Sequence, residues 1–324
     1  MEHRHRVSIS AFAVAVFTLL VPLSATAQSG DGAPRTSWDK PDLQGVWDFA
    51  TMTPMERPAQ FAGKETLTEE DAAAVVANNN QLWQRISEGG DNSTGTYDEF
   101  WFDAGTGVTE DRRTSLITDP PDGKVPPLTA TAAARVSARR AYLRDHPADS
   151  WEDRNIAERC ILGFNTGPPM NPSAYNNVVQ LFQTEDHVVL LNEMVHDSRI
   201  VPLDNRPHLP PHMRQWHGDS RGYWEGDTLV VETINLTDQT SYRGSTESMH
   251  LIERFTRANA DTLVYEFTVT DPRTFTQPWT AKVPMKMSSS PIYEYACHEG
   301  NYGMEGILAG HRDDERTAME ATKQ

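Results

Sequence analysis

The sequence has few cysteines, few basic residues and, after its first residues, no long hydrophobic run. Only two cysteines occur in 324 residues. This excludes a disulfide-dense scaffold and a four-thiolate zinc site. Lysine and arginine number 29 against 46 acidic residues, giving a net charge of -17. Because nucleic acids are bound through clustered basic side chains, we expect no nucleic-acid partner. No segment after residue 27 is apolar enough to span a bilayer, so no stable membrane insertion is expected.

The first 27 residues have the features of a secretory signal peptide. Arg4 and Arg6 precede an apolar stretch over 7–21, and residues 25–27 have the A-x-A form of a cleavage site. We therefore predict that the protein is exported, to the periplasm or to the medium.

Export gives the two cysteines an expected role. Cys160 and Cys297 would meet an oxidising compartment, where paired thiols form disulfides. A bridge between them would close a long loop and stabilise the fold by roughly 4–5 kcal/mol on chain-entropy grounds. We therefore predict a disulfide between Cys160 and Cys297.

Helix signals lie mainly in the first half of the chain. After a polar lead-in over 28–41, we expect a single domain over 42–312 and a polar tail over 313–324. Capping pairs at Thr68 and Ser150, and an Ala- and Arg-rich stretch without glycine or proline, mark helix starts and bodies. The predicted helices cover 68–87, 129–144 and 150–159.

Strand signals dominate the second half. Runs of β-branched and aromatic residues alternate with short polar turns, among them Gly226-Asp227, which is typical of a two-residue hairpin. The predicted strands cover 43–47, 116–118, 177–184, 187–195, 199–203, 221–225, 228–234, 249–257, 262–270, 277–287 and 292–297. Hairpin-linked strands without intervening helices predict an antiparallel sheet, closed into a barrel or, alternatively, folded into a β-sandwich.

Two resemblances support this interpretation. Gly45-x-Trp47 in the first strand resembles the G-x-W motif of lipocalins, which implies a lipocalin-like barrel with two or three helices packed outside it. The segments 224–233 (WEGDTLVVET) and 295–302 (YACHEGNY) resemble a large family of exported proteins of Gram-negative bacteria. That resemblance implies export and a single domain, and it carries over no activity and no catalytic residue.

Ionisable residues occur between apolar neighbours on the predicted strands. Residues two apart share a face of a strand, so such a group is buried or lines a cavity. Glu193, Glu232 and Glu253 have this pattern, as do His196 and His298. A buried carboxylate tends to be paired, protonated or used, and histidine acts as a base near neutral pH. We predict these five residues as catalytic. The alternative for each is an exposed barrel rim or a structural ion pair.

Further residues are candidates for binding substrate. Arg199 and Arg221 can hold an anionic group, and Trp216, Trp224 and Tyr302 can contact a partly apolar molecule.

We predict no cofactor. A divalent metal held by His208, His212 and His217 is a weaker alternative, because Pro210-Pro211 interrupts the helix that the spacing of the first two would need.

These features predict an exported enzyme that uses acid–base chemistry, a hydrolase or lyase, on a small, partly apolar molecule in a barrel pocket. The G-x-S-x-G pattern at 218–222 (GDSRG) leads into a predicted strand rather than a helix, so we do not expect it to form a nucleophile elbow. The alternative is a non-catalytic, lipocalin-like binding protein of the periplasm. Convergence of the five predicted catalytic residues in one cavity would favour the enzyme.

Overall fold

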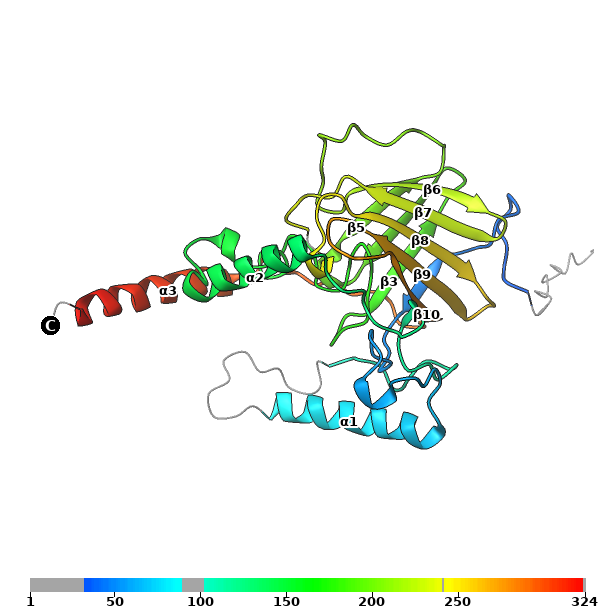
Figure 1. The fold of residues 1–324 in the computed structure, drawn as a ribbon. Helices are drawn as coiled ribbons and strands as arrows, with labels where there is room; N and C mark the ends of the chain where they lie inside the picture. The colour runs from blue at the N-terminus through cyan, green and yellow to red at the C-terminus, as the bar shows by residue number, and fades with distance from the viewer. Residues whose placement is uncertain (1–31, 89–101, 241, 323–324) are drawn as a thin grey trace, which may run out of the picture. The chain divides into compact units, whose positions relative to one another are not determined.

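A computed structural model describes residues 32–88, 102–240 and 242–322 (Figure 1). The predicted signal peptide over 1–27, together with residues 28–31 of the lead-in, lies outside the described residues. The described part of the lead-in forms a turn in which Arg35 pairs with Pro41 in a β-bridge and forms an ion pair with Asp227.

The fold is mainly β, as predicted. The strands are β1 (Gly45–Asp48), β2 (Ile117–Asp119), β3 (Val178–Gln183), β4 (His187–Asn192), β5 (Ser198–Pro202), β6 (Asp219–Glu225), β7 (Thr228–Ile234), β8 (His250–Arg257), β9 (Thr262–Thr270) and β10 (Trp279–Met287). The helices are α1 (Glu69–Ser87), α2 (Ala130–Asp145) and α3 (Tyr302–Ala321), with short 3-10 turns η1 (Ala59–Phe61), η3 (Trp151–Asp153), η4 (Met194–His196) and η5 (Tyr242–Gly244).

The strands form a nearly closed antiparallel barrel. Nine of them pair in the order β5-β4-β3-β1-β10-β9-β8-β7-β6, and β2 pairs with β10. The two end strands, β5 and β6, lie next to each other. At Gly222 of β6, a Cβ would approach Leu203 and Val201 to 2.5 and 2.9 Å, so the absence of a side chain permits this close approach. The lipocalin-like barrel is therefore confirmed.

Alternation along the strands fills the barrel with large side chains. In β9, Leu263, Tyr265, Phe267 and Val269 are fully buried, and the residues between them are half-buried. Their neighbours in the core include Trp47 and Trp279, and the interior is one continuous hydrophobic cluster. The barrel interior is therefore a packed core. A binding site is accordingly expected among the loops around the barrel.

The G-x-W motif closes one end of this core. The Trp47 indole is fully buried and donates a hydrogen bond to the Leu43 carbonyl at 2.9 Å. The Arg257 guanidinium covers its ring at 5.0 Å from the centroid. Gly45 has φ +134°, and Met287 occupies the space where a side chain would stand. The motif therefore fixes β1 between β3 and β10.

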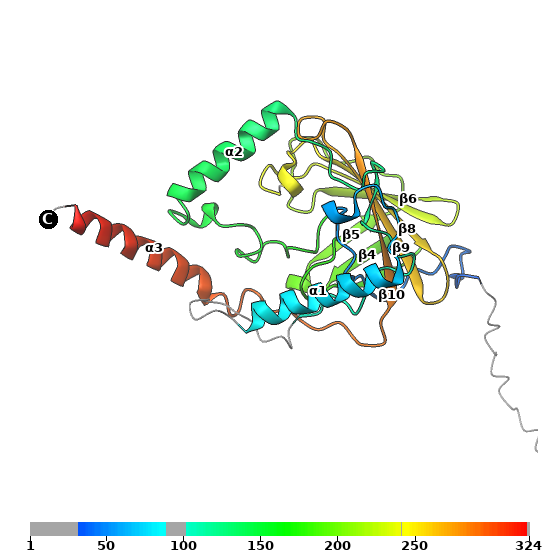
Figure 2. The ribbon, with the colours of Figure 1, turned by 60° about the horizontal axis from the view of Figure 1, so that its bottom comes forward.

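The three α-helices lie outside the barrel (Figures 1 and 2). The Thr68 capping box starts α1, as predicted, and α1 packs on a second apolar cluster that includes Phe61 and Leu67. Thr129 caps α2, where Arg135 donates hydrogen bonds to the Gly244 carbonyl and to Thr274.

Three sequence predictions need correction. The predicted helix over 150–159 is only the 3-10 turn η3, because its capping box at Ser150 starts a single turn. The predicted strand over 292–297 is irregular, although its residues alternate. The third helix is α3, from the C-terminal end of the chain rather than from the first half, and it extends through most of the predicted polar tail.

Cys160 and Cys297 form the predicted disulfide, with their Cα atoms 5.6 Å apart and a sequence separation of 137. Within the described ranges, no helix has both the length and the apolar character needed to cross a membrane.

Candidate functional site

A pocket of about 890 Å³ lies at the disulfide, among four segments of the chain. These segments are the loop over 155–175, the η4 residues Met194 and Val195, the turn around Tyr242, and residues 294–303. None of them belongs to a barrel strand. The barrel thus acts as the support, and loops from both halves of the sequence form the walls.

The disulfide is part of the pocket wall. Cys160 and Cys297 both line the cavity, so the bond joins two of its four segments. Beside it, the Asn301 amide donates hydrogen bonds to the Glu158 carbonyl at 3.0 Å and to the Cys160 sulfur at 3.3 Å. The Asn301 side chain also accepts from the Met304 backbone and so caps α3. The start of α3 and the 155–175 loop are therefore held together at this site.

The lining combines apolar and polar side chains in similar numbers. Its apolar residues include Ile156, Leu162, Phe164, Pro168, Pro169, Met194 and Val195, and its polar side chains include those of Asn155, Glu158, Asn171, Tyr175, Thr240, Tyr242, Glu294 and Asn301. Phe164 and Tyr175 pack edge to face, with centroids 5.3 Å apart. No lysine, arginine or histidine occurs among the described lining residues. The charged lining groups are therefore carboxylates.

One phenol in the lining is kept in its neutral form. Burial raises the pKa of Tyr242, and the nearby positive charge of Arg243 opposes this only in part. Tyr242 also stacks on the core residue Trp279, with centroids 6.0 Å apart. The phenol therefore lies between the pocket and the barrel core.

A buried ion pair lies inside the barrel behind this site. Arg199 of β5 donates two hydrogen bonds to Glu253 of β8, one of them at 2.9 Å. Tyr265 donates a third to Glu253, at 2.8 Å, and accepts one from the Met170 backbone at 3.1 Å. Burial raises the pKa of Tyr265 well above its usual range. Because Glu253 is fully buried and its charge is met by Arg199, the two residues compensate each other.

His217 and Asp197 lie beside this ion pair. Burial, with the charge of Arg199, lowers the pKa of His217 to about 4. The Asp197 carboxylate is 3.8 Å from His217 Nε2, beyond hydrogen-bonding distance. It instead accepts hydrogen bonds from the Gly163 backbone and from Thr166, both at 3.1 Å, and burial raises its pKa. Asp197 thereby anchors the loop that lines the pocket.

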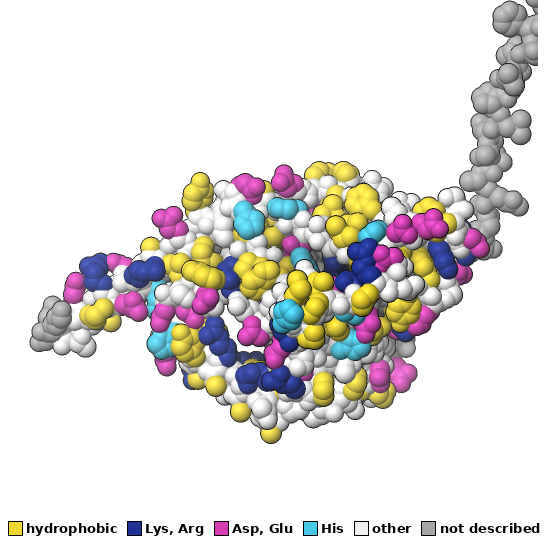
Figure 3. Space-filling view, turned by 90° about the horizontal axis from the view of Figure 1, so that it is seen from above, with side chains coloured by type: hydrophobic (Ala, Val, Ile, Leu, Met, Phe, Trp, Pro, Cys, Tyr) yellow, Lys and Arg dark blue, Asp and Glu magenta, His cyan; other side chains and the backbone are white. Residues whose placement is uncertain are grey.

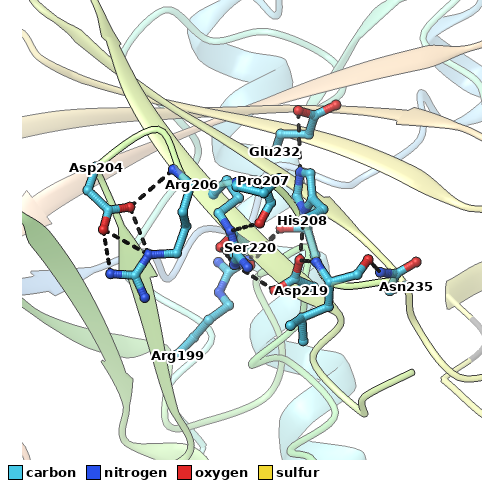
Figure 4. A network of polar contacts seen from close by, with 12 residues as sticks. Arg199, Asp204, Arg206, Pro207, His208, Asp219, Ser220, Glu232 and Asn235 are labelled. Carbon is cyan, nitrogen blue, oxygen red and sulfur yellow. Dashed lines mark hydrogen bonds and ion pairs between the residues drawn. The ribbon is translucent and has the colours of Figure 1, made fainter. Parts of the chain in front are cut away.

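A second polar network lies on the outer face of the barrel (Figure 4). Asp219 shares hydrogen bonds with His208 Nδ1 at 2.8 Å, the Leu209 backbone at 2.8 Å and Arg221 at 2.6 Å. Arg221 also donates to the Pro207 carbonyl. Arg221, predicted to bind substrate, therefore pins the β5–β6 loop to the sheet.

Glu232 belongs to the same outer network. It forms a hydrogen bond with His250 Nε2 at 2.6 Å and has His208 Nε2 at 3.5 Å. The β7–β8 register explains its separation from Glu253: Val231 is opposite Glu253, and Glu232 is opposite Ile252, on the other face. Two predicted catalytic carboxylates are thus divided between the inside and the outside of the barrel.

The remaining predicted catalytic residues gather outside the pocket, along the 293–298 segment. Glu193 accepts hydrogen bonds from the Asn176 side chain and, at 3.2 Å, from the Tyr293 backbone. His196 is exposed and shares a hydrogen bond with the Tyr295 carbonyl at 3.2 Å. His298 is exposed as well. The structure therefore does not bring the five predicted residues into one cavity.

The predicted aromatic contacts also lie outside the pocket lining. Tyr302 is 79% exposed at the start of α3. Trp216 is half-buried, with the Arg159 guanidinium 5.8 Å from its ring. Trp224 packs partly against the barrel core and carries Lys40 at 5.6 Å.

The three histidines of the alternative metal site have different surroundings. His208 belongs to the outer network, His212 is exposed, and His217 lies beside Arg199. Among the described residues, none of them belongs to a group of three or more ligand atoms within 4.8 Å of one another.

Sequence reasoning missed most of the pocket lining. The 155–175 loop carries the run Gly167-Pro168-Pro169 between the helical and the strand-rich halves, and a long proline-bearing loop at such a junction is the signal that could have found it. The predictions of His298 and Tyr302 were closer, since Gly300 and Asn301, which lie between them in sequence, line the pocket.

The surface is chemically mixed. In the face shown in Figure 3, acidic and basic side chains lie next to each other with hydrophobic ones between them. Comparisons with the models of known protein families, with curated proteins and with solved structures found no match.

Proposed function

We propose that the protein is a lipocalin-like binding protein that holds a small, partly apolar molecule in the pocket beside the disulfide. The observation that carries this proposal is the cavity itself, about 890 Å³ with a lining of mixed apolar and polar side chains. Sites for small molecules typically have volumes of roughly 300–1,000 Å³, with apolar surface for contact and polar groups that fix the orientation of the ligand.

The charged groups of the pocket favour a particular ligand class. Glu294 and Glu158 line it, Glu158 is ion-paired with Arg154, and no basic side chain occurs among the described lining residues. An anionic ligand would meet the charge of Glu294 without a cationic partner in the lining. We therefore propose an uncharged or cationic ligand, held by apolar contacts and by hydrogen bonds to groups such as Asn171 and Tyr242.

The acid–base enzyme is less well supported. It required the predicted catalytic residues in one cavity. Glu253 lies in a buried ion pair, Glu232 lies on the outer face, and the others lie outside the lining. A binding protein needs none of them for chemistry.

We further propose that the protein works after export, in the periplasm or outside the cell. The disulfide supports this, since such bonds persist in oxidising compartments. The features of residues 1–27 in the sequence favour the same route.

Binding of Nile red, an uncharged dye, tests the pocket. Its fluorescence should rise with the purified protein, and Ala296→Trp, in the lining, should weaken binding. An overpacking cost of about 1–3 kcal/mol corresponds to roughly fivefold to 150-fold in affinity.

Ala258→Trp is the matched control, because Ala258 is exposed in the β8–β9 turn. It should leave the affinity for Nile red unchanged. Equal effects of the two substitutions, or no dye binding by the parent protein, would refute the pocket. If the dye binds as expected, native mass spectrometry would identify a ligand that co-purifies with the protein.

A further inference from the structure

A cluster of four ionisable side chains joins α3 to the end of α2. His146 is the residue that caps the C-terminus of α2, and Asp149 follows it in the next loop. His311 and Glu315 are four residues apart on α3, and therefore on one face of that helix. We call these four residues the α2–α3 cluster. It lies outside the pocket lining and outside both polar networks described above.

The ligand atoms of this cluster lie close together. His311 Nε2 is 3.0 Å from Asp149 Oδ1 and 3.7 Å from Glu315 Oε1. His146 Nδ1 is 2.7 Å from the other oxygen of Asp149. Among the described residues, Asp149, His311 and Glu315 are the one set of three such residues whose ligand atoms all lie within 4.8 Å of one another.

These separations match the edges of a tetrahedral zinc site. Zinc binds imidazole nitrogen and carboxylate oxygen at about 2.0–2.2 Å. Ligand atoms at the corners of such a tetrahedron are therefore about 3.4 Å apart. The distances of 3.0 and 3.7 Å from His311 lie on either side of this value. Asp149, His311 and Glu315 therefore have the spacing that three zinc ligands need.

The charges of the cluster also suit a divalent cation. Two carboxylates face two imidazoles, so the cluster is doubly negative when both histidines are neutral. Mixed nitrogen and oxygen ligands favour zinc over magnesium, which prefers oxygen.

We propose that the α2–α3 cluster binds one zinc ion. Asp149, His311 and Glu315 are the ligands, water fills the fourth position of the tetrahedron, and His146, which bonds the other oxygen of Asp149, orients that carboxylate from the outer shell. The ion would join α3 to the loop after α2. Together with the disulfide and Asn301 at the start of α3, it would fix this helix at two points.

Isothermal titration of the mature, untagged protein with zinc chloride, after EDTA treatment and dialysis, tests this proposal. We expect one zinc ion per chain. His311→Ala removes the central ligand. Loss of an outer-shell partner weakens metal binding about tenfold to a hundredfold, so loss of this ligand should weaken zinc binding at least as much. Glu315→Gln, which keeps the shape of the side chain, should also weaken it. Magnesium chloride should give no comparable binding.

Two control variants locate the ion. His212→Asn alters an exposed histidine, and His208→Asn alters the outer network; both should bind zinc like the parent. Cobalt in place of zinc should give the strong visible absorption of a tetrahedral site in the parent and lose it in His311→Ala. Absence of micromolar zinc binding would overturn the proposal. So would full binding by His311→Ala, or loss of binding only in the His208 variant.

Discussion

At the scale of single residues, His217 is the group through which pH should act on stability. Its folded-state pKa is about 4, against 6.5 when it is free, because burial and Arg199 disfavour the imidazolium. Below pH 6.5 the unfolded chain therefore binds a proton that the folded chain does not bind. Stability falls as the pH falls from 6.5 towards 4, and His217 contributes a loss of about 2 kcal/mol between pH 7 and pH 5.

The prediction is checked by urea unfolding of the parent and of His217→Asn at both pH values. The variant keeps a polar side chain of similar size without the titration, so its free energy of unfolding should fall less on acidification. His212→Asn, at an exposed position, should behave like the parent. Parallel pH profiles for the parent and His217→Asn would contradict the assignment.

At the scale of elements, the N-terminus of α2 offers a matched pair of threonines. Thr129 caps the helix by accepting from the Ala132 backbone, and its hydroxyl donates to the Arg273 carbonyl at 3.0 Å. Thr129→Ala should lower the free energy of unfolding by about 1 kcal/mol. Thr131→Ala, at an exposed position in the first turn, should be neutral or slightly stabilising, since alanine favours helix. Chemical denaturation measures both, and equal losses would exclude a specific cap.

Capping and alternation made most elements predictable. Thr68 and Thr129 mark the starts of α1 and α2, and Gly226-Asp227 forms the β6–β7 hairpin. The same rules failed where the conformation of a segment depends on the other parts of the fold that it contacts. Residues 292–297 alternate like a strand but are not in the sheet, and α3 forms although it contains Gly303, Gly306 and Gly310.

The candidate site was less predictable, for a related reason. Alternation places Glu232 and Glu253 among apolar neighbours, yet only the β7–β8 register decides that Glu253 faces the core and Glu232 faces outward. The outer face near Glu232 is itself covered, since Val230 beside it is fully buried. Apolar flanks therefore do not identify the interior of a barrel. The pocket depends on loops brought together by the disulfide, and local sequence does not encode that arrangement.

At the scale of the whole molecule, the disulfide is the main covalent constraint on the fold. It connects positions 137 apart, so in the unfolded chain it closes a loop spanning the segment after α2, most of the barrel and the approach to α3. Removing it should lower the free energy of unfolding by up to about 5 kcal/mol on chain-entropy grounds. Because both cysteines line the pocket, its removal should also weaken Nile red binding.

Reduction with dithiothreitol and the double variant Cys160→Ser with Cys297→Ser together test the expected losses of stability and of Nile red binding. Reduction of the parent should lower the urea midpoint to that of the double variant, and the double variant should not respond to the reductant. The stability loss and the binding loss separate the two roles of the bond. If the reduced protein is less stable but binds the dye as before, the bond constrains the unfolded chain without shaping the pocket. If neither property changes on reduction, the barrel and its packed core hold the loops without the bond, and the expected stabilisation is wrong.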